Sequence, residues 1–199
     1  SGLAVLSGPP GAGKTHLAQV WAARTGARWQ PVAALAADLP MLLAPGTTPR
    51  ALVIDEAQRL AGTPGEEALF HLLNHLRGRG QVLLTANGPA RDWGVRLPDL
   101  ASRLAVGAHL ALLPPDEALL AAVLVKLFDD RQIRVEPSLI DYLVSRMERS
   151  LAAARGLVNR LDALALQRQR RISRDLAREV LNADIAGETA TPGTLDSGV

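Results

Sequence analysis

The sequence predicts an α/β protein in which helices flank a parallel sheet, followed by a small all-α domain. Residues 3–7, 51–55 and 81–86 are short, continuous apolar runs, LAVLS, ALVID and QVLLTA. Such runs are typical of strands that are buried on both faces of a parallel sheet. Segments with helical spacing, 15–24 and 65–77, alternate with these runs. This alternation of strand and helix indicates βαβ units.

A second, helical domain is expected to begin near residue 113. Pro114-Pro115 interrupts the chain, and the sequence beyond it has helical spacing with few strand-like runs. The last residues are rich in Gly, Thr, Ser and Pro and poor in apolar side chains, which favours disorder. We therefore expect an α/β base over 1–112, a helical lid over 113–185 and a disordered tail over 186–199. The helices of the lid are expected near 115–128, 137–147, 150–168 and 174–183.

The composition is that of a globular protein and excludes several kinds of site. Of the 199 residues, 48% are hydrophobic and only 3% are aromatic, so leucine, alanine and valine must form most of the core. The absence of cysteine excludes disulfides, iron–sulfur clusters and cysteine-ligated zinc, and it fits a cytoplasmic protein. The apolar runs are too short to span a membrane, and no signal peptide is visible. A net charge of +2 does not by itself indicate nucleic-acid binding.

Residues 8–15, GPPGAGKT, match the phosphate-loop pattern G-x-x-x-x-G-K-[ST]. The glycines allow the backbone to wrap around phosphates with its N–H groups pointing inward. Lys14 would place a positive charge against the β- and γ-phosphates, and the Thr15 hydroxyl would ligate Mg²⁺. A predicted strand precedes the motif and a predicted helix follows it, as this chemistry requires. The residues expected to contact a nucleotide are Gly8, Pro9, Pro10, Gly11, Ala12, Gly13, Lys14, Thr15 and His16.

Polar residues end two further predicted strands. In LVIDE, Asp55 follows an apolar strand and is expected to hold the Mg²⁺ shell, directly or through water. Glu56 is expected to orient an attacking water as a general base. In QVLLTAN, Asn87 is the candidate for a side chain that senses the γ-phosphate, with Thr85 as the second choice. The alternative for Asn87 is a simple turn, because Asn-Gly-Pro is also a good turn sequence.

Five motifs together resemble those of the DnaA-related AAA+ family, in the same order and with similar spacing. They are GPPGAGKTHLA, LVIDEAQ, FHLLN, LLTANGPAR and LPDLASRL. The resemblance covers residues 3–183 and is most specific over 97–104, where LPDLASRL is similar to the Hda branch of the family. It implies an AAA+ base with a helical lid. It also implies that Arg103 is an arginine finger, which acts in trans on the nucleotide of a neighbouring subunit.

The lid departs from the family at one position. Residues 146–162 resemble the stretch that carries the sensor-2 arginine, but the arginine position falls on Ala152. Arg149 and Arg155, one turn to either side, remain the two candidates for a phosphate contact. This departure predicts weak ATP turnover by the chain itself, whereas Glu56 keeps a self-sufficient ATPase open as an interpretation.

The resemblance implies a regulator of chromosome replication initiation that binds ATP or ADP with Mg²⁺. Its implied partners are DnaA, whose ATP hydrolysis it would stimulate, and the sliding clamp, with a homo-oligomer as a further possibility. The clamp-binding peptide of the family precedes the first strand, and we expect it upstream of Ser1, since the chain does not begin with methionine. We expect a cytoplasmic protein, associated with the nucleoid through its partners. No sequence-specific DNA binding is expected, because no basic helix-turn-helix follows the lid. The alternative is an initiator fragment or helicase loader that binds single-stranded DNA.

Overall fold

The computed structural model describes residues 2–188, and of residues 184–188 only the backbone. Contacts divide the chain between Pro114 and Pro115 into two compact units. Among the described residues, no helix has both the length and the apolar character needed to cross a membrane. Each unit is described below by itself.

The first unit contains a five-stranded parallel sheet with the strand order β2-β3-β4-β1-β5. Its strands are β1 (Leu3–Ser7), β2 (Arg28–Trp29), β3 (Ala51–Ile54), β4 (Gln81–Ala86) and β5 (Ala108–Ala111). In the register of the sheet, Ser7 lies beside Ala86, and Ile54 lies beside Leu84. The carboxyl ends of β1, β3 and β4 therefore meet at one edge, where the segments that follow them carry the predicted site.

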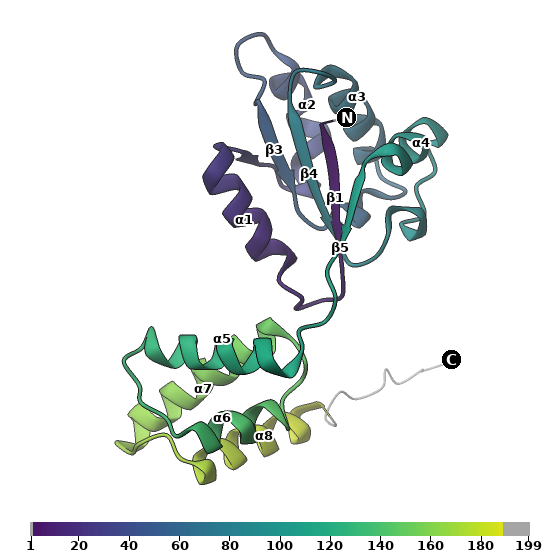
Figure 1. The fold of residues 1–199 in the computed structure, drawn as a ribbon. Helices are drawn as coiled ribbons and strands as arrows, with labels where there is room; N and C mark the ends of the chain where they lie inside the picture. Colours follow the sequence, from purple (N-terminus) through teal and green to yellow (C-terminus); the bar gives the residue numbers. More distant parts are fainter. Residues whose placement is uncertain (1, 189–199) are drawn as a thin grey trace, which may run out of the picture. The chain divides into compact units, whose positions relative to one another are not determined.

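Helices cover both faces of this sheet (Figure 1). They are α1 (Lys14–Thr25), α2 (Leu35–Leu43), α3 (Gly65–His75) and α4 (Pro98–Val106), with short 3₁₀ turns η1 (Val32–Ala34), η2 (Ala57–Leu60) and η3 (Ala90–Asp92). The helix α1 lies on one face, and α2, α3 and α4 lie on the other (Figure 1).

Alternate strand residues pack against the two helical layers, because successive side chains of a strand point to opposite faces. Leu52 and Ile54 of β3 join the core formed with α2, α3 and α4, whereas Val53 packs with Ala18 of α1. All four residues of β3 are buried. The prediction of strands buried on both faces is thus confirmed, and with it the fold class.

The second unit is a bundle of four helices, α5 (Glu117–Asp129), α6 (Pro137–Val144), α7 (Leu151–Arg168) and α8 (Arg174–Glu188). Two of them begin at side-chain caps, which satisfy N–H groups that the helix leaves unpaired. The Asp116 carboxylate accepts from the Leu119 N–H at 2.7 Å, and the Ser150 hydroxyl accepts from the Ala153 N–H at 2.9 Å. The core is almost entirely aliphatic, with Phe128 its largest fully buried side chain.

The structure adds elements that the sequence did not predict and corrects one boundary. The strands β2 and β5 and the helix α2 have no counterpart among the expected elements. The helix α8 runs to Glu188, so the first three residues of the expected tail, 186–188, are helical. Leu181 and Ile185 are four residues apart, so helical spacing continues past the predicted end at residue 183. Residues 189–199, the rest of the expected tail, lie outside the described residues.

Candidate functional site

The glycine-rich loop connects the end of β1 to the start of α1. The Gly8 N–H donates to the Ala86 carbonyl at 3.2 Å, which ties the loop to β4. A Cβ atom at Gly8 would lie 2.7 Å from the Leu112 carbonyl oxygen, so only glycine fits there. Gly13 precedes α1 in the left-handed region, with φ of 97°. Within the described residues no side chain caps α1, so its first N–H groups are open to an anion.

Lys14 places its ammonium inside this loop. The side chain is 8% exposed, and its Nζ donates to the carbonyl oxygens of Gly8 and Pro9, each at 2.8 Å. Burial lowers the pKa of Lys14, and the charges of Asp55 and Glu56 oppose that shift. The two carbonyls are neutral acceptors, so a phosphate oxygen would bind this ammonium more strongly.

A buried hydroxyl organises the acidic pair after β3. The Thr85 side chain in β4 is fully buried, and its hydroxyl donates to Asp55 Oδ1. The Thr85 hydroxyl oxygen also accepts from the Glu56 N–H at 3.1 Å. Thr15, the second residue of α1, donates from Oγ1 to Asp55 Oδ2 at 3.0 Å. The Asp55 carboxylate is therefore held between the phosphate loop and the central strand of the sheet.

The donor set formed by Thr15 and Asp55 fits a magnesium ion. Mg²⁺ takes hydroxyl, carboxylate and phosphate oxygens, and proteins usually hold it through one or two side chains plus substrate phosphates. The hydroxyl and the carboxylate are already within hydrogen-bond distance of one another, beside the loop that would carry the phosphates.

Glu56 has a backbone conformation that non-glycine residues rarely adopt. Its φ is 56°, in the left-handed region, which costs about 1–2 kcal/mol. Its carboxylate is 46% exposed and forms an ion pair with Arg59 at 3.0 Å. Strain of this kind is concentrated at functional sites. The turn at Glu56 separates the two acids, with Asp55 hydrogen-bonded to Thr15 and Thr85 and Glu56 facing solvent.

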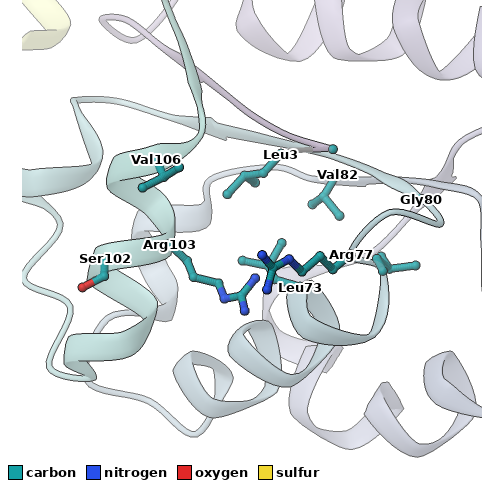
Figure 2. A pocket seen from close by; sticks show the side chains of 10 residues that line it. Leu3, Leu73, Arg77, Gly80, Val82, Ser102, Arg103 and Val106 are labelled. Carbon is teal, nitrogen blue, oxygen red and sulfur yellow. The ribbon is translucent and has the colours of Figure 1, made fainter.

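Arg103 lies at the opposite edge of the sheet from the phosphate loop. It comes from α4, is half-buried, and has its guanidinium carbon 5.9 Å from the centroid of the Phe70 ring on α3. It lines a pocket of 480 Å³ together with Leu3, the first residue of β1, and Val82, the second residue of β4 (Figure 2). The phosphate loop instead follows Ser7, the last residue of β1, about 13 Å further along the strand.

Comparisons with known proteins show which proteins this chain resembles. The family model described as "Hda, lid domain" matches residues 116–181. The chromosomal replication initiator protein DnaA of Cutibacterium acnes is 28% identical over 145 residues, which make up 72% of this chain. This chain is thus similar to the DnaA-related AAA+ proteins. It spans 29% of the length of that DnaA.

Solved structures show that this chain shares its fold with DnaA proteins. Domain III of the Thermotoga maritima replication initiation protein DnaA matches with a TM-score of 0.77 and 20% identity, over 91% of this chain and 83% of that chain. A replication initiator DnaA bound to AMPPCP and single-stranded DNA matches with a TM-score of 0.67 and 21% identity, over 84% of this chain and 58% of that chain.

The structure brings some residues of the predicted site together and leaves others apart. Gly8, Lys14, Thr15 and Asp55 come together at the carboxyl edge of the sheet, joined by the hydrogen bonds above. Asn87, the residue directly after β4, has an exposed side chain. Thr85, the second choice for the sensor, is instead the residue that bonds to the acidic pair. His16 is exposed in the first turn of α1.

The two arginines of the second unit that are candidates for a phosphate contact differ in their own contacts. Arg149 forms an ion pair with Glu117 at 2.5 Å, and both side chains are more than half exposed. Arg155 lies exposed on α7, one turn after Ala152, which is also exposed. Each could turn toward an anion, so the choice between them stays a prediction.

Sequence reasoning missed Glu66, a buried acid that holds the entry to α4. Its carboxylate, only 4% exposed, accepts hydrogen bonds from the backbone N–H groups of Gly62 at 2.6 Å, Arg96 at 2.9 Å and Leu97 at 2.8 Å. Leu97 directly precedes the helix that carries Arg103. A signal was present, because Thr63 and Glu66 have the spacing of a capping box at the start of α3.

Proposed function

We propose that the carboxyl edge of the sheet binds an adenine nucleotide with Mg²⁺. The support is the arrangement of Lys14 inside the loop and of Thr15 and Asp55 within 3.0 Å of one another. When bound, the ion would supply charge neutralisation between the phosphates. The chain's own residues would bind and orient the nucleotide: Lys14 through its ammonium, Thr15 and Asp55 through their oxygens, and the loop through its N–H groups. Glu56, exposed beside them, is the candidate to accept a proton from an attacking water.

The proposed role of the protein is that of an Hda-like regulator of replication initiation. It would stimulate ATP hydrolysis by DnaA together with the sliding clamp, and Arg103 would act in trans as an arginine finger. The observation that carries this proposal is the position of Arg103, at the edge of the sheet opposite to the protein's own phosphate loop. A guanidinium there is available to the nucleotide of another subunit and not to its own. The match of residues 116–181 to the Hda lid model favours a regulator over an initiator.

The test follows the hydrolysis of ATP bound to DnaA in the presence of DNA-loaded sliding clamp. Addition of the wild-type protein is expected to accelerate hydrolysis, and Arg103→Ala to abolish the acceleration, since an arginine finger contributes about 10³–10⁵ in rate. Arg24→Ala is the matched control, because Arg24 is an exposed arginine in the last turn of α1, on the other face of the sheet. Equal rates with wild type and Arg103→Ala would refute the role of Arg103.

A second candidate function is binding to single-stranded DNA. It is favoured by the similarity in fold to a DnaA that was solved with AMPPCP and single-stranded DNA. This function predicts tight binding of a labelled oligonucleotide that weakens steeply with salt, because each phosphate contact releases counterions. The regulator predicts little binding at the same salt concentrations. Fluorescence anisotropy at two salt concentrations distinguishes the two functions.

A further inference from the structure

The pocket that contains Arg103 holds a second arginine. Arg77 follows the end of α3, and its side chain extends toward that of Arg103 (Figure 2). The pocket wall between them is apolar and includes Leu3, Leu73 and Val82. Of the described residues that line this pocket, none is acidic. Two positive side chains thus converge on an apolar wall that brings no carboxylate to neutralise them.

The two arginines of the pocket differ in this respect from several other arginines of the chain, which have a carboxylate partner. Examples are Arg59, which pairs with Glu56 at 3.0 Å, and Arg168, which pairs with Glu179 at 2.5 Å. Within residues 2–188, neither Arg77 nor Arg103 has such a pair, and the one contact found for Arg103 is with the Phe70 ring. Like charges that converge repel one another unless an anion binds between them. The pocket is therefore suited to an anion that another molecule supplies.

The geometry points to a two-guanidinium phosphate site, in which Arg77 is the second cation on the terminal phosphates of the neighbouring subunit's ATP. This inference rests on the proposed function, because Arg103 is taken to reach the same phosphates. Polyphosphate is favoured over a single carboxylate because two guanidiniums present two planar sets of N–H donors, which match several phosphate oxygens at once.

The two arginines are expected to contribute unequally. In the hydrolysis, a water oxygen bonds to the γ-phosphorus while the bond to the β–γ bridging oxygen breaks, which yields ADP and inorganic phosphate. Negative charge then develops on the bridging oxygen as it leaves, and two guanidiniums stabilise that charge better than one. Arg103 is half-buried and in contact with Phe70, so it is more firmly positioned. Arg77 is exposed at the rim, so its contribution is expected to be the smaller one.

The experiment measures DnaA-bound ATP hydrolysis with DNA-loaded clamp as a function of the concentration of each variant. Arg77→Ala is expected to lower the maximal stimulated rate by about tenfold to a hundredfold, the effect of one lost hydrogen bond to a charged group, with an unchanged half-maximal concentration. Arg77→Lys should recover part of the loss, because it keeps the charge but not the planar donor set. Arg79→Ala is the matched control, since Arg79 is exposed two residues further along but does not line this pocket.

Each result has a separate meaning. If Arg103→Ala abolishes stimulation while Arg77→Ala behaves like Arg79→Ala, the second cation is refuted and the proposed function stands. If Arg77→Ala raises the half-maximal concentration at an unchanged maximal rate, Arg77 contacts an acidic side chain of the partner, which also overturns the inference. If the wild-type protein fails to stimulate DnaA at all, the proposed function fails and this inference with it.

Discussion

Replacement of Glu66 by glutamine tests whether one buried carboxylate fixes the entry to α4. The carboxylate accepts from three backbone N–H groups, those of Gly62, Arg96 and Leu97, at 2.6–2.9 Å. Glutamine has nearly the same shape, but it offers one oxygen in place of two and turns an NH₂ group toward N–H donors. At least one of these donors would be left without a partner in a buried position.

The expected cost follows from these bonds. A hydrogen bond to a charged group contributes about 1.5–3 kcal/mol, and an orphaned buried donor costs about 1–3 kcal/mol. Because such terms are not additive, we expect Glu66→Gln to lower the free energy of unfolding of the first unit by about 2–4 kcal/mol. At an m-value of about 2 kcal/mol/M in urea, the midpoint would fall by about 1–2 M.

Urea unfolding followed by tryptophan fluorescence measures this effect in the first unit alone, because Trp21, Trp29 and Trp93 all lie before Pro114. The matched control is Glu67→Gln, since Glu67 is the next residue of α3 and is exposed. A midpoint for Glu66→Gln equal to that of Glu67→Gln would refute the reasoning. The same variant should also stimulate DnaA less well, because Leu97 leads directly into the helix of Arg103.

The difference in stability between wild type and Glu66→Gln is expected to change with pH in one direction. Burial alone would raise the pKa of Glu66, but hydrogen bonds from Gly62, Arg96 and Leu97 and the charge of Arg96 outweigh it, so the pKa lies below the ordinary value of 4.5. A carboxyl with a lowered pKa in the folded state stabilises the fold above its unfolded pKa and loses this effect as the pH falls through the folded pKa. The stability difference between wild type and Glu66→Gln should therefore be constant near neutral pH and shrink below about pH 4.5.

Three further changes test other parts of the structure. Lys14→Ala should weaken binding of a fluorescent ATP analogue by at least about tenfold, because a phosphate would lose its buried ammonium partner. Thr85→Val removes a donor from Asp55 and an acceptor from the Glu56 N–H, so urea unfolding should show a loss of about 1–3 kcal/mol, and Mg²⁺-dependent nucleotide binding should weaken. Phe128→Ala should destabilise the second unit by about 3–5 kcal/mol, seen as faster hydrogen exchange in α5 and α7; unchanged exchange would contradict its place in that core.

The sequence predicts those parts of the fold whose causes are local. The strand β3 is a continuous apolar run because both of its faces are buried, so its residues alone identify it. The phosphate loop can also be predicted from the sequence, because its glycines are required by the backbone. Gly8 allows a close backbone approach, and Gly13 adopts a left-handed conformation. The helices of the second unit follow from apolar spacing and from caps such as Asp116.

The parts that the sequence misses depend on distant residues. The strand β5 is exposed along its whole length and is defined by its pairing with β1, so its own residues carry no strand pattern. The helix α2 contains Pro40, which argues against a helix on propensity alone. Glu66 and Glu67 are adjacent and identical in type, and their roles differ because only Glu66 meets N–H groups from a segment thirty residues away.

The geometry of β1 constrains how any activity of Arg103 can work. Leu3 begins this strand and lines the arginine pocket, whereas Ser7 ends it and leads into the phosphate loop. The strand is paired on both sides, with β4 and β5, so the two places cannot approach one another without unfolding of the sheet. If Arg103 promotes hydrolysis, it therefore does so on a nucleotide that another subunit holds. The stimulated rate must then rise with the concentration of the second subunit and saturate when every nucleotide-bearing subunit has a partner. A rate per molecule that is independent of concentration would be incompatible with an arginine in this position.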